Sequence, residues 1–234
     1  MEIIQGIHQI EAGKTVDFGF YTNCFLIEQD GLILIDTGLP GNTEKILSYI
    51  TGTIHLDPQD IHTIILTHYH QDHTGNIIEL QQITGAKIAI HIADAKLLSD
   101  QIKQNFQQKE IKSEEEILNK EKFLNFTPDI LLNDGEIIAG MQCIHVLGHT
   151  PGNVAFFDSK RKILFCGDTI FGIDGKVDIP QGIQERMKTM GTLDITRESM
   201  KKLRALDYNI LLFGHGDPIL ENASNIVNKF INIF

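Results

Sequence analysis

The chain has 234 residues, of which 42% are hydrophobic and 22% charged, and its formal net charge at pH 7 is −11. These proportions are typical of a globular protein, and the acidic charge argues against nonspecific binding to nucleic acid or to an anionic membrane surface. The N-terminus has an acid at position 2 and no long apolar core. No apolar run approaches the roughly 18–20 residues that a membrane span requires. We therefore expect no nucleic-acid partner and no membrane partner, while a homodimer remains open.

The cysteines indicate the compartment. Cys24, Cys143 and Cys166 are odd in number, widely spaced and set in apolar surroundings. This pattern favours buried thiols in a reducing environment over a disulfide framework. We therefore expect a cytoplasmic protein.

Short apolar runs bounded by turn residues recur along the chain, and their length and β-branched content predict buried strands. In chain order these runs are NCFLIEQ (23–29), LILID (32–36), TIILT (63–67), KIAIH (87–91), MQCIHVL (141–147), NVAFFD (153–158), KILFC (162–166) and NILLF (209–213). Capping signals and amphipathic patterns between them predict helices over 41–51, 75–85, 195–207 and 222–234. The alternation predicts an α/β protein with two sheets.

Residues 96–126 differ from the rest because they are rich in Gln, Lys and Glu and contain neither Gly nor Pro. The stretch predicts one or two helices that form a solvated surface insertion. An alternative is a lid over a pocket, with Phe106, Phe123 and Phe126 facing the ligand.

The stretch THYHQDHTG (67–75) carries the clearest chemical signal, since it crowds His68, His70, Asp72 and His73 behind one predicted strand. In a turn these side chains can converge on one point. Such a cluster is costly unless something positive pairs with it, and a divalent cation does so.

Three further predicted strands end in the same way. GHTPG places His149 after one strand, GDTIF places Asp168 after the next, and GHGDP places His215 after the last. A glycine beside each residue lets the backbone pass close to a crowded ion. Seven ligands exceed what one tetrahedral zinc ion takes, so two metal ions that share a bridging carboxylate are the economical interpretation.

This motif set resembles the metallo-β-lactamase superfamily, whose order of motifs it follows from IDTG (35–38) onward. The resemblance implies one domain over residues 1–234, an αββα sandwich of two mixed sheets with helices outside. It implies that His68, His70 and His149 hold one metal ion and that Asp72, His73 and His215 hold a second. Asp168 would bridge the two ions, and Asp36 would orient a ligand histidine.

The resemblance also implies hydrolysis of a small-molecule substrate. Paired cations lower the pKa of a bridging water, so that hydroxide attacks a carbonyl, and Asp72 is the candidate to orient it and pass on a proton. The ligand set holds no cysteine and suits zinc first, with iron or manganese as alternatives.

The substrate signal lies in GDTIFGIDGKVDIPQG (167–182), which resembles a stretch of glyoxalase II-like thioesterases. Phe171, Asp178 and Pro180 match that stretch, Lys176 stands where an arginine is usual, and Asn153 replaces a second histidine. We expect thioester or small-ester hydrolysis, with Phe171 and Lys176 as candidate substrate contacts.

Two alternatives share the fold. A lactonase of the acyl-homoserine-lactone type would resemble a pattern with tyrosine at position 171, where this chain has Phe171. A persulfide dioxygenase with one iron ion would use fewer of these ligands. A carboxylate of the substrate could also pair with Lys176, Arg186 or Lys188, which follow in the same segment.

Overall fold

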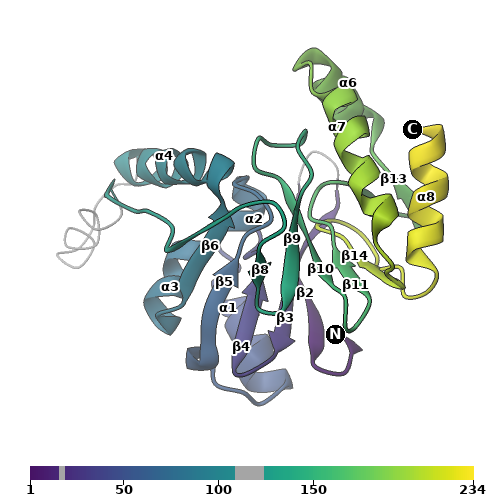
Figure 1. Ribbon diagram of the computed structural model, residues 1–234. Coiled ribbons are helices and arrows are strands. Elements are labelled where there is room, and N and C mark those ends of the chain that lie inside the picture. The colour runs from purple at the N-terminus through teal and green to yellow at the C-terminus, as the bar shows by residue number, and fades with distance from the viewer. Residues whose placement is uncertain (16–18, 109–123) are drawn as a thin grey trace.

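The computed structural model describes residues 1–15, 19–108 and 124–234. Two β-sheets face each other, and helices cover the outer face of each sheet (Figure 1). The predicted αββα sandwich is thus confirmed.

The first sheet has the strand order β1-β2-β3-β4-β5-β6-β7. Its strands are Glu2–Ile4, Ile7–Lys14, Tyr21–Glu28, Leu32–Ile35, Ile61–Ile65, Lys87–His91 and Ile130–Leu132. Strands β1 to β4 pair antiparallel, whereas β4, β5, β6 and β7 run parallel. The carboxyl ends of β4, β5 and β6 therefore meet at one edge of the sheet.

The second sheet has the strand order β14-β11-β10-β9-β8. Its strands in chain order are β8 Ile137–Ile138, β9 Met141–His145, β10 Val154–Asp158, β11 Ile163–Phe165 and β14 Ile210–Leu212. Strands β11 and β14 are parallel, and β10 is antiparallel to both β9 and β11. Strands β9, β11 and β14 therefore point the same way. A separate hairpin joins β12 Phe171–Ile173 to β13 Lys176–Asp178.

Period-2 alternation divides the side chains of the buried strands between two layers. In β4, Ile33 and Ile35 pack between the sheets, while Leu32 and Leu34 pack against the helices outside the first sheet. Both faces of β4 are covered, which explains why its sequence is apolar throughout.

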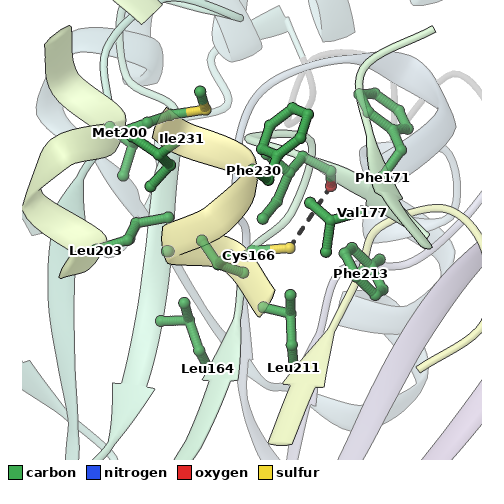
Figure 2. Close-up of a cluster of buried hydrophobic side chains, with 14 of the residues drawn as sticks. Leu164, Cys166, Phe171, Val177, Met200, Leu203, Leu211, Phe213, Phe230 and Ile231 are labelled. Carbon is green, nitrogen blue, oxygen red and sulfur yellow. Dashed lines mark hydrogen bonds between the residues drawn. The ribbon is translucent and has the colours of Figure 1, made fainter. Parts of the chain in front are cut away.

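The helices form the two outer layers. Outside the first sheet lie α1 Thr43–Ser48, the π-helical turn Tyr49–Thr53, the 3₁₀ turn Pro58–Asp60, α3 Ile77–Thr84 and α4 Ile92–Gln108. Outside the second lie α6 Gln181–Thr189, α7 Leu193–Met200, the 3₁₀ turn Lys201–Ala205 and α8 Ala223–Ile233. Figure 2 shows Phe230 and Ile231 of α8 packed over Leu164, Cys166 and Leu211 of the second sheet.

All eight predicted strands are present, but several elements were not predicted. The N-terminal strands β1 and β2, the short β7 and β8, the β12–β13 hairpin and α6 lacked clear sequence signals. The three cysteines are free and buried, as predicted. Across the residues that the structure describes, no helix is both long and apolar enough to cross a membrane.

The predicted insertion is only partly described. Helix α4 starts four residues earlier than expected and packs Leu98 and Ile102 into the core outside the first sheet. Phe106 and Phe126 pack against the same core, so the hypothesis that they face a ligand is wrong. Phe123 lies outside the described residues.

Candidate metal centre

The seven candidate ligands lie at the carboxyl ends of four strands. His68, His70, Asp72 and His73 follow β5, His149 follows β9, Asp168 follows β11, and His215 follows β14. Because β9, β11 and β14 point the same way, their last residues reach one edge of the sandwich. The structure brings all seven side chains together there, as two groups.

The first group is His68, His70 and His149, and one ring nitrogen from each lies within 4.8 Å of the other two. His70 Nδ1 is 2.9 Å from His149 Nε2. His68 Nε2 is buried and has no hydrogen-bond partner among the described residues. A buried unpartnered nitrogen is costly in a native protein. Three nitrogens that converge in this way fit a divalent metal ion.

The second group is Asp72, His73, Asp168 and His215, which meet the same 4.8 Å limit. His215 Nε2 lies 3.2 Å from Asp72 Oδ2 and 3.3 Å from His73 Nε2. His73 Nε2 lies 3.2 Å from Asp168 Oδ1. Two carboxylates and two imidazoles around one point again form a set of ligands for a divalent ion.

Asp168 stands between the two groups. Its Oδ2 atom is 3.4 Å from His149 Nε2 in the first group and 3.3 Å from His215 Nε2 in the second. Only 4% of Asp168 is exposed. A carboxylate in this position can contribute an oxygen to each of two neighbouring ions.

The four candidate ligands after β5 were expected in one irregular turn that leaves the strand, but only His68 and His70 lie outside a helix. The loop ends at His70, and α2 (Gln71–Thr74) forms a single helical turn that carries Asp72 and His73. The backbone N–H groups of His73 and Thr74 both donate to the carbonyl of His70. This turn directs Asp72 and His73 to the second group while His68 and His70 stay in the first.

Asp36 fixes the orientation of two histidines. His73 Nδ1 donates to Asp36 Oδ2 at 2.9 Å, and Thr67 Oγ1 donates to the same oxygen at 2.8 Å. Because the Thr67 hydroxyl hydrogen is used in this way, His68 Nδ1 donates to Thr67 Oγ1 at 3.0 Å. In the neutral form of each ring, which is the form that binds a metal ion, the lone pair then lies on Nε2, which faces the centre.

His215 is oriented by the main chain instead, since its Nδ1 lies 3.2 Å from the carbonyl oxygen of Tyr21. Its ring also stacks on Phe171, with centroids 5.6 Å apart and planes inclined by 10°. Hydrogen bonds on the far nitrogen are the usual way in which proteins orient metal-binding histidines.

The electrostatics differ between the two groups. Burial lowers the pKa of His68, of His149 and of His70, the last to about 3, so these rings are neutral at pH 7. Neutral imidazole is the form that binds metal ions.

In the second group, burial lowers the pKa of His73 and His215, but the neighbouring carboxylates, Asp168 and Asp72, together with Asp36 beside His73, outweigh this effect. The pKa of His73 is raised, and that of His215 is raised to about 9. Burial raises the pKa of Asp72, but His73 and His215 outweigh it and lower the pKa to about 2. The two carboxylates of this group therefore require a positive charge beside them. Protons bound to the histidines supply that charge in the metal-free chain, and a metal cation can take their place.

Position 214 requires a glycine because the backbone there passes close to two candidate ligands. A Cβ atom on Gly214 would lie 2.4 Å from Asp168 Oδ1 and 2.8 Å from His73 Cε1. The residue before His215 must therefore lack a side chain, as the sequence analysis expected of the ligand-bearing turns.

A cavity of about 450 Å³ opens onto the candidate centre, and five of the seven candidate ligands line it. The lining residues outside the centre are mostly apolar; they are Thr15, Phe20, Leu39, Gln71, Phe171, Ile183, Arg186, Met187, Met190 and Thr192. Of the predicted substrate contacts, Phe171 lies in this lining and Lys176 does not. Of the three cations considered, only Arg186 lines the cavity.

Asp94 was not predicted as a residue of the site, yet it is fully buried behind the first group. Its carboxylate accepts from Thr150 Oγ1 at 2.6 Å, Gly152 N at 2.6 Å and Tyr69 N at 3.2 Å. These donors lie in the turns that carry His149 and His70, so Asp94 ties the two turns together. Asp94 follows the predicted strand KIAIH by three residues, and this position near a strand end was the sequence signal that could have indicated a role at the site.

Comparisons with known proteins agree with this architecture. The family model described as the metallo-β-lactamase superfamily matches residues 17–215. Hydroxyacylglutathione hydrolase GloC of Haemophilus influenzae is 29% identical over 216 residues, which cover 91% of this chain and 94% of the relative. The uncharacterised protein YobT of Bacillus subtilis is 33% identical over 153 residues, or 64% of this chain and 62% of the relative.

Among solved structures, a metallo-β-lactamase family protein from Thermus thermophilus superposes with a TM-score of 0.69. The match covers 99% of this chain and 80% of that one, at 19% sequence identity, and it therefore supports the fold alone. Because the family model spans most of the chain, this protein belongs to the metallo-β-lactamase superfamily. The family implies divalent metal ions.

Proposed function

We propose that this metallo-β-lactamase superfamily protein is a hydrolase that cleaves a thioester or a related small ester at a centre of two divalent metal ions. The observation that carries the proposal is the division of seven side chains into two groups that share Asp168. His68, His70 and His149 would hold one ion, and Asp72, His73 and His215 the other. Zinc is the first expectation for such a set of histidines and carboxylates.

Bound divalent ions would supply a water of lowered pKa and a Lewis acid for the carbonyl oxygen of the substrate. The buried histidines of the centre would keep their Nε2 or Nδ1 lone pairs aimed inward. Asp36, Thr67 and the carbonyl of Tyr21 would prevent the rings of His73, His68 and His215, respectively, from turning away. The chain's contribution here is a rigid and preorganised set of ligands.

Asp72 is our candidate for proton transfer. Its side chain is 25% exposed and lines the cavity, whereas the side chain of Asp168 is only 5% exposed. As an anion at pH 7, Asp72 can orient the attacking water and accept its proton. The acyl carbon gains the water oxygen, the carbon–sulfur bond breaks, and the leaving thiolate takes the proton from Asp72.

A thioester is favoured by two observations. Residues 167–182 resemble a stretch of glyoxalase II-like thioesterases, and a relative named hydroxyacylglutathione hydrolase aligns along nearly the whole chain. A lactonase is less favoured because position 171, beside the centre, holds a phenylalanine that is only 1% exposed and stacks on His215. Phenylalanine has no hydroxyl to assist a lactone.

The test is to assay thioesters, aryl esters, an acyl-homoserine lactone and a β-lactam on one preparation whose metal content has been measured. We expect close to two transition-metal ions per chain and the highest kcat/KM on a thioester. A reproducible content near one ion, with no gain when metal is added, would refute the dinuclear centre. A clear preference for the lactone would refute the thioester assignment.

A further inference from the structure

We infer that the substrate carries an apolar group together with a single anionic group, and that Arg186 recognises the anion. This inference rests on the proposed function and narrows the substrate class of the same centre. It comes from the cavity in front of the metal centre, whose lining was not apparent from the sequence motifs.

The lining outside the centre is mainly hydrophobic. Six of the lining side chains are apolar: Phe20, Leu39, Phe171, Ile183, Met187 and Met190. Ligand cavities of this composition gain affinity from buried hydrocarbon and take their specificity from a few polar groups. Phe171, Ile183 and Met187 are themselves packed in the core outside the second sheet, so that side of the cavity is firmly supported.

Helix α6 provides the one lysine or arginine among the described lining residues, Arg186. Ile183 and Met187 lie three residues before and one residue after Arg186, and they anchor α6 in the core, with 8% and 4% exposure respectively. Arg186 itself is exposed on this anchored helix, and it forms no ion pair within the described part of the chain. An arginine held in this way is available for a carboxylate of the substrate.

The acidic lining residues are Asp72 and Asp168, and both belong to the metal centre. No other carboxylate of the described residues lines the cavity, so an ammonium group on the substrate would find no counter-ion among the described lining residues. A zwitterionic peptide carrier such as glutathione has two carboxylates and one ammonium group, and it matches the described lining, with its one arginine, less well than a substrate with a single anionic group. An acyl chain with one carboxylate matches it well.

Two independent effects follow for substrates. Each methylene that enters the apolar part of the cavity should raise kcat/KM about fourfold. A carboxylate that reaches Arg186 should strengthen binding about tenfold, since Arg186 is exposed and its interactions are partly screened by solvent.

The binding test uses metal-loaded protein and a thioether that cannot be hydrolysed, 3-(hexylthio)propionate, with its amide as the neutral probe of equal size. The variants are Arg186→Gln, which keeps much of the side chain, and Lys188→Gln as a matched control. Lys188 lies on the same helix, is exposed, and does not line the cavity. Titration calorimetry at two salt concentrations measures each dissociation constant.

We expect the carboxylate probe to bind the wild-type protein more tightly than the amide probe, and more weakly at high salt. Arg186→Gln should weaken binding of the carboxylate probe about tenfold and leave the amide within about twofold. Lys188→Gln should change neither. Equal binding of both probes to the wild-type protein, or an equal response of both variants, would overturn the role of Arg186. A carboxylate bound by the metal ions alone would be insensitive to Arg186→Gln and would overturn it too.

The turnover test separates this inference from the proposed function. Acetyl, butanoyl and hexanoyl thioesters of 3-mercaptopropionate and of its amide are compared with a lactoyl thioester of glutathione. Hydrolysis that rises with chain length and favours the carboxylate, with the charge effect mostly on KM, supports both proposals. Hydrolysis that is fastest on the glutathione thioester would overturn the substrate class but not the reaction. Tight, Arg186-dependent binding without any thioester turnover would overturn the reaction alone.

Discussion

Asp94 should control the affinity of the first metal ion, although it is not a candidate ligand. It lies in the first turn of α4, behind the carboxyl end of β6, and ties the His149 turn to the His70 turn. Asp94→Asn keeps the shape of the side chain but removes its charge. It also places an amide N–H₂ group opposite one of the three donors that the carboxylate satisfies.

The size of the effect follows from the three hydrogen bonds. Hydrogen bonds to an ionised acceptor contribute about 1.5–3 kcal/mol each and those to a neutral one about 0.5–1.5 kcal/mol, and here one bond is lost outright. Because burial raises the pKa of Asp94, removal of the charge returns part of this loss. We expect about 2–4 kcal/mol of destabilisation, and a fall of about 10- to 100-fold in the affinity for one of two zinc ions.

Asp158 provides the matched control. It is 4% exposed, lies at the far end of β10, and accepts from the backbone N–H groups of Lys160 and Arg161 at 3.0 Å each and from Arg161 Nη1 at 2.8 Å. Asp158→Asn should destabilise the fold to a similar extent, because it also disturbs three bonds to a buried carboxylate. It should leave zinc affinity within about threefold, since its turn carries no candidate ligand.

The assay combines thermal unfolding with zinc competition against a chromogenic chelator that resolves two binding steps. Thr150→Val, which removes only one donor to Asp94, provides a milder variant should Asp94→Asn fail to fold. It should weaken the same binding step several-fold. Equal losses of stability in Asp94→Asn and Asp158→Asn, together with equal zinc affinities, would refute the role of Asp94 in metal binding.

The other predictions concern the second group. Asp36→Asn, which suits the left-handed backbone at that position (φ 59°), should lower zinc affinity about 10- to 100-fold through His73, as measured by the same competition. Asp72→Asn should lower kcat about 100-fold or more while at least one ion per chain remains by elemental analysis, and near wild-type turnover would contradict a proton-transfer role. Because the raised pKa of His215 is about 9, a proton competes with metal at pH 7. Zinc affinity of this group should therefore rise from pH 7 to pH 9, by up to about tenfold per pH unit for each proton displaced, and a flat profile would contradict this. Gly214→Ala should reduce zinc content, since the added methyl would collide with Asp168 Oδ1.

The candidate ligands could be identified from the sequence because each one follows a strand that is itself easy to predict. Runs such as TIILT and NILLF are apolar on both faces, and the polar residue that follows each run directly or after one glycine stands out. Parallel pairing then brings strand ends to one edge without further information. The local geometry was less predictable. The helical turn of α2 depends on backbone hydrogen bonds to the His70 carbonyl, and the amino-acid sequence gives no specific signal for such bonds.

Most of the elements that were not predicted, although not the eight-residue strand β2, share a physical reason. Strands β7, β8, β12 and β13 are only two or three residues long, which is too short for a period-2 pattern to be distinguished. Helix α6 lacks a side-chain cap and buries only Ile183 and Met187, so its apolar stripe is narrow. These elements obtain their stability from packing against the rest of the fold rather than from local preference.

This difference explains why the reaction centre is easier to infer from sequence than the substrate. The centre is built from short motifs in which ligand and strand are adjacent in the chain. The cavity is built from side chains far apart in sequence, such as Leu39 and Met190, which only the packing of α6 brings to the same space. Lys176 illustrates the consequence, since it matches a motif position yet lies outside the cavity lining, whereas Arg186 on the unpredicted helix lies within it. Substrate preference in this chain should therefore change with substitutions on α6 that leave every metal-binding motif intact.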